Sequence, residues 1–128
     1  MKYIVTAFTL SLLMFSCQRE TTYTSLNTND FKDVIENLEV QLLDVRTIDE
    51  FNSGHISDAE FIDLSDSLFI EKADSMFNKK QTIAVYCRTG RRSKKAADLL
   101  IKHGFKVIEL DSGITNWIEK DFPIVEQK

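Results

Sequence analysis

The chain has 128 residues, of which 43% are hydrophobic and 28% charged, and its net charge is −4. This length and composition fit one globular domain with a hydrophobic core and leave no room for a second domain. The acidic balance argues against a protein that binds nucleic acid or anionic membranes through a general positive charge.

The first seventeen residues have the layout of a secretory signal, because Met1-Lys2 precedes the apolar stretch 3–15 and then the pair Ser16-Cys17. About fifteen helical residues rise about 1.5 Å each and reach about 22 Å, which is short of the ~30 Å hydrocarbon core of a bilayer. A permanent membrane span is therefore not expected.

The pair Ser16-Cys17 resembles the end of the lipobox of bacterial lipoproteins, in which the cysteine carries a lipid and becomes the mature N-terminus. At the two positions before Ser16, Met14 and Phe15 differ from the leucine and the small residue that a lipobox usually has. An apolar leader that is cleaved in another way, or that is retained, therefore remains an alternative. The resemblance implies an exported protein of the cell envelope, anchored to a membrane through Cys17 and facing the periplasm. Residues 18–22 are polar and would form a short tether to a domain at 23–128.

Apolar spacing along this domain predicts strands that alternate with helices. Asn29 is a candidate cap for the first helix, Thr47 and Glu50 fit a capping box for the second, and Gly104 is placed to end the fourth. The expected strands are 23–26, 40–45, 61–64, 82–86 and 107–110, and the expected helices are 31–38, 47–54, 66–77, 94–103 and 114–118. This alternation predicts an α/β fold of three layers, with a mostly parallel central sheet flanked by helices.

Cys87 stands between the buried strand 82–86 and the helix that follows it. The C-terminal end of a parallel strand is where α/β folds place their sites, and a helix N-terminus favours a thiolate or a bound anion. Five cations crowd the same segment, where they would oppose the helix dipole unless an anion binds among them. They are Arg88, Arg91, Arg92, Lys94 and Lys95. The sequence therefore predicts a reaction site at Cys87, although a buried, inert cysteine is the alternative.

The motifs along the domain resemble those of single-domain rhodaneses, the thiosulfate sulfurtransferase-like family. Asp58 and Ser112 depart from the family pattern at positions where glycine is common. The motifs that carry the resemblance are Asp44-Val45-Arg46, Glu50-Phe51, Gly54-His55-Ile56, Ala59, the loop 85–93, Ala96-Ala97, Gly104-Phe105, Val107, Leu110, Gly113 and Trp117.

This resemblance implies that Cys87 takes a sulfane sulfur from thiosulfate or a similar anionic donor and passes it, as a persulfide, to a nucleophilic acceptor. Asp44 and Arg46 would support the site. The expected substrate-binding residues are those of the loop after the cysteine, with Arg88 and Arg92 as the candidates that grip the donor: Arg88, Thr89, Gly90, Arg91, Arg92 and Ser93. Neither a cofactor nor a metal is expected, because the cysteines and histidines lack ligand spacing.

Two other functions compete with sulfur transfer. A phosphatase or arsenate reductase of related fold would need Cys-x5-Arg, but Ser93 occupies the arginine position and Arg92 gives Cys-x4-Arg. A non-catalytic or relay module would bind a protein of the envelope or carry sulfur to it. His55 is expected to be structural rather than a general base. The expected partners are a small anionic sulfur donor and a protein or thiol acceptor, with no nucleic acid, and the domain is expected to be a monomer.

Overall fold

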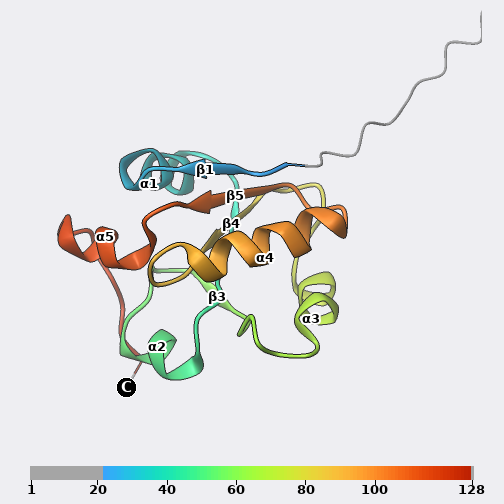
Figure 1. Ribbon diagram of the computed structural model, residues 1–128. Coiled ribbons are helices and arrows are strands. Elements are labelled where there is room, and N and C mark those ends of the chain that lie inside the picture. The colour runs from blue at the N-terminus through green and yellow to red at the C-terminus, as the bar shows by residue number, and fades with distance from the viewer. Residues whose placement is uncertain (1–21, 128) are drawn as a thin grey trace, which may run out of the picture.

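Five parallel strands form the central sheet of the computed structural model, which describes residues 22–127 (Figure 1). Their order across the sheet is β1-β5-β4-β2-β3, and every neighbouring pair is parallel. The strands are β1 (Thr24–Leu26), β2 (Gln41–Asp44), β3 (Glu60–Phe61), β4 (Ile83–Tyr86) and β5 (Val107–Leu110). The predicted α/β fold with a mostly parallel sheet is confirmed.

Helices cover both faces of this sheet and complete the three layers (Figure 1). One face packs against α3 and α4, and the other packs against α1 and α5. The helices are α1 (Thr28–Asn37), α2 (Ile48–Ser53), α3 (Phe69–Met76), α4 (Arg91–Lys102) and α5 (Gly113–Glu119). None of the helices within residues 22–127 combines the length and the apolar character that crossing a bilayer requires.

The alternation of side chains along each strand separates two hydrophobic clusters. Val85 and Cys87 lie in the cluster under α3 and α4, whereas Ala84 and Tyr86 lie in the cluster under α1 and α5. Both clusters consist of buried side chains, so the sheet is buried on its two faces, as parallel sheets generally are. The predicted leader 1–17, its Cys17 and residues 18–21 of the tether lie outside the described residues.

Some predicted element boundaries differ from the structure for local reasons. The cap of α1 is Asn27 rather than Asn29, since the Asn27 side chain accepts a hydrogen bond from the Asp30 amide at 2.8 Å. The predicted capping box at the start of α2 is present. Strand β3 is shorter than predicted and begins one residue earlier. Beyond it, the chain continues alongside β2 through isolated amide bonds, such as Ile62 N to Asp44 O at 3.1 Å.

Helix α4 begins three residues earlier than predicted, at Arg91. Gly90 precedes it in the left-handed conformation, with φ of 98°, which glycine adopts without the strain of a side chain. Asp58 also has a positive φ, of 67°, at the place where the rhodanese pattern commonly has glycine. Ser112 has φ of −92° and so does not need glycine's freedom.

Candidate functional site

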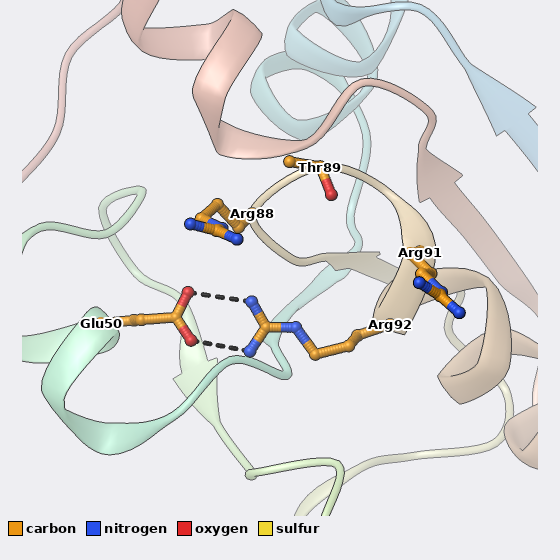
Figure 2. A pocket seen from close by; sticks show the side chains of 5 residues that line it. All are labelled: Glu50, Arg88, Thr89, Arg91 and Arg92. Atoms are coloured by element: carbon orange, nitrogen blue, oxygen red, sulfur yellow. Dashed lines mark hydrogen bonds and ion pairs between the residues drawn. The ribbon is translucent and has the colours of Figure 1, made fainter.

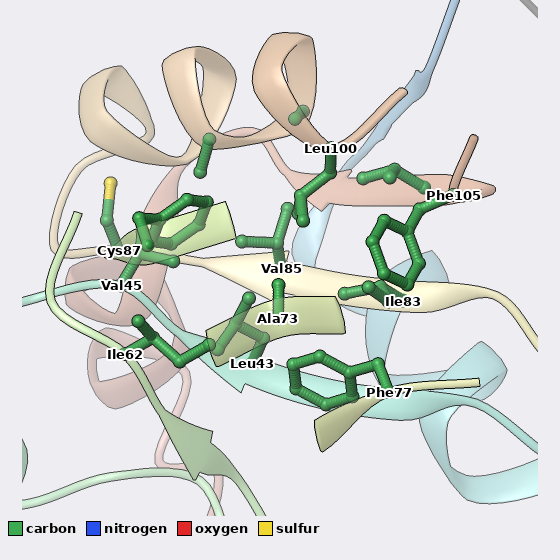
Figure 3. Close-up of a cluster of buried hydrophobic side chains, with 14 residues drawn as sticks. Leu43, Val45, Ile62, Ala73, Phe77, Ile83, Val85, Cys87, Leu100 and Phe105 are labelled. Carbon is green, nitrogen blue, oxygen red and sulfur yellow. The ribbon is translucent and has the colours of Figure 1, made fainter. Parts of the chain in front are cut away.

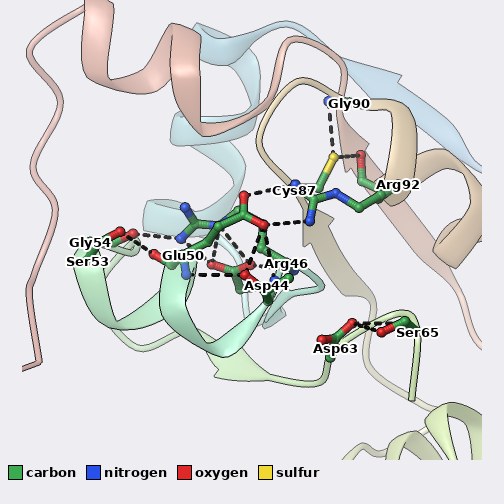
Figure 4. A network of polar contacts seen from close by, with 12 residues as sticks. Asp44, Arg46, Glu50, Ser53, Gly54, Asp63, Ser65, Cys87, Gly90 and Arg92 are labelled. Carbon is green, nitrogen blue, oxygen red and sulfur yellow. Dashed lines mark hydrogen bonds and ion pairs between the residues drawn. The ribbon is translucent and has the colours of Figure 1, made fainter. Parts of the chain in front are cut away.

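The sulfur of Cys87 lies at the end of β4 and faces the loop that leads into α4. Its Sγ accepts a hydrogen bond from the Gly90 amide at 3.1 Å and lies 3.4 Å from Ser93 Oγ. Figure 4 shows the bond between Gly90 and the sulfur of Cys87. The structure therefore brings together Cys87, Gly90 and Ser93, three of the predicted site residues.

Cys87 is only 1% exposed and also belongs to the hydrophobic cluster under α4. In Figure 3 its sulfur lies at one end of that cluster, on the side of α4. The thiol is thus buried, but its polar contacts are to the loop rather than to the apolar interior. With 1% of the residue exposed, this sulfur is almost inaccessible to solvent in the structure.

The first turn of helix α5 forms hydrogen bonds to the loop that follows β4. The amides of Ile114 and Thr115 donate to the carbonyls of Cys87 and Arg88, at 2.9 and 3.1 Å. Gly113 lies so close to the loop that a Cβ on it would be 2.2 Å from the Arg88 carbonyl oxygen. A Cβ on Gly90 would be 1.9 Å from the carbonyl oxygen of Asp111. The loop and the start of α5 therefore fit together only with glycine at both positions.

A polar depression of about 600 Å³ opens over the loop (Figure 2). Its lining consists of Glu50, Arg88, Thr89, Arg91 and Arg92. The side chains of Arg88, Thr89 and Arg91 are exposed, and neither Arg88 nor Arg91 forms an ion pair within residues 22–127. These two guanidinium groups therefore give the polar depression a positive charge, which suits an anionic substrate.

Arg92, which is predicted to grip the donor together with Arg88, pairs with Glu50 in the structure. Its two terminal nitrogens donate to the two carboxylate oxygens of Glu50, at 2.7 and 2.9 Å (Figure 2). The hydrogen bonds from Arg92 lower the pKa of Glu50 from 4.5 to about 2. An anionic ligand would therefore have to share Arg92 with Glu50 or displace it.

Asp44 and Arg46 form a buried ion pair beside the loop (Figure 4). Arg46 Nη2 lies 2.7 Å from Asp44 Oδ2 and donates a second bond to the Gly54 carbonyl at 2.6 Å. Burial alone would lower the pKa of Arg46, but the hydrogen bonds and charge of Asp44 outweigh it, so the pKa is raised. The pair ties the end of β2 to the turn after α2.

Comparison with known proteins identifies the family of the chain. The model of the rhodanese-like domain family matches residues 27–120. The chain belongs to this family. A "sulfurtransferase" of Allochromatium vinosum is 34% identical to this rhodanese-like chain over 88 residues, which are 68% of this chain and 79% of that protein.

Two other relatives agree with this assignment. A "putative sulfur carrier protein" of Bacillus subtilis is 34% identical over 92 residues, 70% of this chain, but this chain spans only 48% of that protein. The crystal structure of a rhodanese-related protein from Thermoplasma volcanium superposes with a TM-score of 0.70 at 29% identity, and the match covers 80% of this chain and 98% of that one.

Other polar side chains near the site have structural partners in this rhodanese-like domain. His55 is buried, its Nδ1 lies 2.9 Å from the Phe51 carbonyl oxygen, and its ring stacks on Phe51 at 3.8 Å between centroids. Lys94, which the sequence suggested only as part of a general positive field, forms ion pairs with Glu109 and Asp111. Within the described part of the chain, no cluster of three His, Cys, Asp or Glu side chains could hold a metal ion.

Two carboxylates near the loop were not predicted as site residues. Glu50 was assigned only to a motif and a helix cap, and Glu109 only to a strand. Their contacts with Arg92 and Ser93 span 42 and 16 residues of sequence, respectively. A charged residue within the apolar run 107–110 was the only local signal for Glu109.

Acid is expected to weaken the fold partly through Glu50. Because its pKa is lower in the folded chain than in the unfolded chain, its stabilising contribution is complete above the ordinary value of 4.5 and is lost as the pH falls toward about 2. The difference in the free energy of unfolding between the wild type and Glu50→Gln should therefore shrink over this interval. Urea unfolding at a series of pH values measures it.

Glu39→Gln is the matched control, because Glu39 is exposed and its side chain makes no hydrogen bond to another residue of the segment 22–127. Its difference from the wild type should stay close to zero at every pH. A Glu50→Gln difference that keeps its neutral-pH size down to the lowest pH measured would contradict the ion-pair explanation.

Proposed function

We propose that this rhodanese-like domain is a sulfurtransferase that moves a sulfane sulfur from thiosulfate, or a similar anionic donor, to a nucleophilic acceptor through a persulfide on Cys87. The observation that carries the proposal is the Cys87 sulfur, which accepts the Gly90 amide at 3.1 Å. The same loop supplies Arg88 and Arg91 to the polar depression, and neither forms an ion pair within residues 22–127. The names of two relatives, a sulfurtransferase and a putative sulfur carrier protein, support it.

In the first half-reaction the Cys87 thiolate attacks the outer sulfur of thiosulfate. A bond forms between Cys87 Sγ and that sulfur, and the bond to the central sulfur breaks with its electron pair leaving on sulfite. The product is the persulfide anion of Cys87. Loop amides such as that of Gly90 are placed to stabilise the negative sulfur, since a turn of successive N–H groups favours anions.

In the second half-reaction a nucleophile such as cyanide attacks the terminal sulfur. The bond to Cys87 breaks, its electron pair returns to Cys87 Sγ as a thiolate, and thiocyanate leaves. Arg88 and Arg91 attract the dianionic donor to the polar depression. Both side chains are exposed in its lining, and neither has an ion-pair partner in the part of the chain that the structure describes. Guanidinium groups suit the oxygens of thiosulfate.

Incubation of the purified protein with thiosulfate tests the proposal. Intact-mass spectrometry should show the addition of one sulfur atom, and later addition of cyanide should remove it and release thiocyanate. Digestion should place the sulfur on the peptide that contains Cys87. A protein that stays unmodified across a range of thiosulfate concentrations would overturn this function.

The proposed location is the cell envelope, where a lipid on Cys17 would hold the domain at a membrane near a protein or thiol acceptor. The support is the pair Ser16-Cys17 after the apolar stretch 3–15. Metabolic labelling with a palmitate analogue should mark the wild-type chain and spare Cys17→Ala, with Cys87→Ala labelled like the wild type. Equal labelling of the wild type and Cys17→Ala would contradict the anchor.

A further inference from the structure

Glu109 is a completely buried carboxylate that the proposed reaction does not use. It lies on β5 and is 0% exposed. Alternation along the strand directs it to the same face as Val107, which packs in the cluster under α4. A buried charge is costly unless it is paired and hydrogen-bonded, so its partners show what this position does.

Three side chains from two other elements bind this carboxylate. Ser93 Oγ donates to Oε1 at 2.6 Å, Ser25 Oγ donates to Oε2 at 2.6 Å, and Lys94 Nζ lies 3.3 Å from both oxygens. Lys94 is itself shared with Asp111, at 2.8 Å. Tyr23 also lies near Glu109, and its pKa is raised by burial and then by the charges of Asp98 and Glu109.

The hydroxyl of Ser93 has one hydrogen and two neighbours that compete for it. At 2.6 Å from the Glu109 carboxylate this hydrogen is committed to Glu109, because bonds to a charged acceptor are short and strong. The Ser93 oxygen then offers only lone pairs to Cys87 Sγ, 3.4 Å away, and so accepts a bond from the protonated thiol. An ionised sulfur receives no hydrogen bond from Ser93 in this arrangement. Within residues 22–127 it keeps the bond from the Gly90 amide, and it interacts with the charge of Arg92.

We propose that Glu109 is a positioning residue that binds the hydrogen of the Ser93 hydroxyl and thereby keeps this hydroxyl from donating to the ionised sulfur of Cys87. The inference deepens the proposed function, since it concerns the same sulfur. Substitution of Glu109 by a neutral residue releases the Ser93 hydrogen to Cys87, where it stabilises the ionised sulfur. Glu109 and Cys87 thus compete through one shared hydroxyl.

Alkylation by iodoacetamide as a function of pH tests the competition, read by mass on the peptide that contains Cys87. This reaction needs no sulfur donor, so its result is independent of whether thiosulfate loads the protein. Glu109→Gln keeps the shape of the side chain, and its alkylation at about pH 6, below the ordinary range of thiol ionisation, should be roughly tenfold faster than that of the wild type. An unchanged pH profile would overturn the proposal.

Two further variants separate positioning from simple loss of a negative charge. In a Ser93→Ala background, Glu109→Gln should change the low-pH rate by less than about twofold, because the shared hydroxyl is gone. The same tenfold gain in that background would show that charge alone acts. Ser25→Ala is the matched control, since it removes an equally short bond to the same carboxylate without touching Ser93, and its profile should follow the wild type.

Ser93→Ala alone keeps the proposal testable if Glu109→Gln does not fold. The Ser93 hydrogen gives nothing to the ionised sulfur in the wild type, so its removal should not slow alkylation at about pH 6. A roughly tenfold slowing would show that Ser93 donates to Cys87 rather than to Glu109, and that result would also overturn the proposal.

Discussion

Cys87→Ser is expected to abolish sulfur loading while leaving the fold intact. A serine hydroxyl at this position can still accept the bond from the Gly90 amide, so the loop keeps its geometry. Its oxygen is far less nucleophilic than a thiolate and forms no persulfide. The mass increase with thiosulfate and the release of thiocyanate with cyanide should both fall below detection.

The stability of this variant should change by no more than about 1.5 kcal/mol, the range for one altered hydrogen bond, as urea unfolding would show. Cys17→Ala is the control for cysteine content and should load sulfur like the wild type. If Cys87→Ser still gained a sulfur atom, another residue would be the nucleophile and the loop would have a different role.

Arg46→Met is expected to cause a large loss of stability. The substitution leaves Asp44, which is 0% exposed, without the cation that binds both of its oxygens. Removal of one partner of a buried ion pair costs about 3–5 kcal/mol, because the remaining charge stays buried and unpaired. The urea midpoint should fall accordingly.

Two variants test that reason. Asp44→Asn combined with Arg46→Met should recover part of the loss, since no charge remains buried. Arg91→Met changes an exposed arginine that forms no ion pair within residues 22–127, and its free energy of unfolding should stay within about 0.5 kcal/mol of the wild type. A loss as large for Arg91→Met as for Arg46→Met would show that burial of Asp44 is not the cause.

Features set by neighbouring residues could be predicted from the sequence. The capping box of Thr47 and Glu50 spans three residues, and its chemistry is visible in the residue types alone. The strand that ends at Leu110 and the position of Cys87 at a strand end follow from apolar runs. Such signals predict the α/β class because each element carries its own periodicity.

Features that depend on distant partners could not be predicted in the same way. The ion pair between Arg92 and Glu50 was not predicted, because the two residues are 42 positions apart in the sequence and lie on different helices, α4 and α2. The start of α4 was misplaced because the left-handed conformation of Gly90 is fixed by its fit against Asp111 in another segment. Side-chain pairing across elements therefore had to come from the structure.

The dependence of the loop on α5 has a consequence for synthesis on the ribosome. The carbonyls of Cys87 and Arg88 are bound by amides of Ile114 and Thr115, which are translated more than twenty residues later. A nascent chain that has emerged only as far as α4 lacks the groups that give the loop its final form. The reactive segment is thus completed only after the start of α5 has been translated.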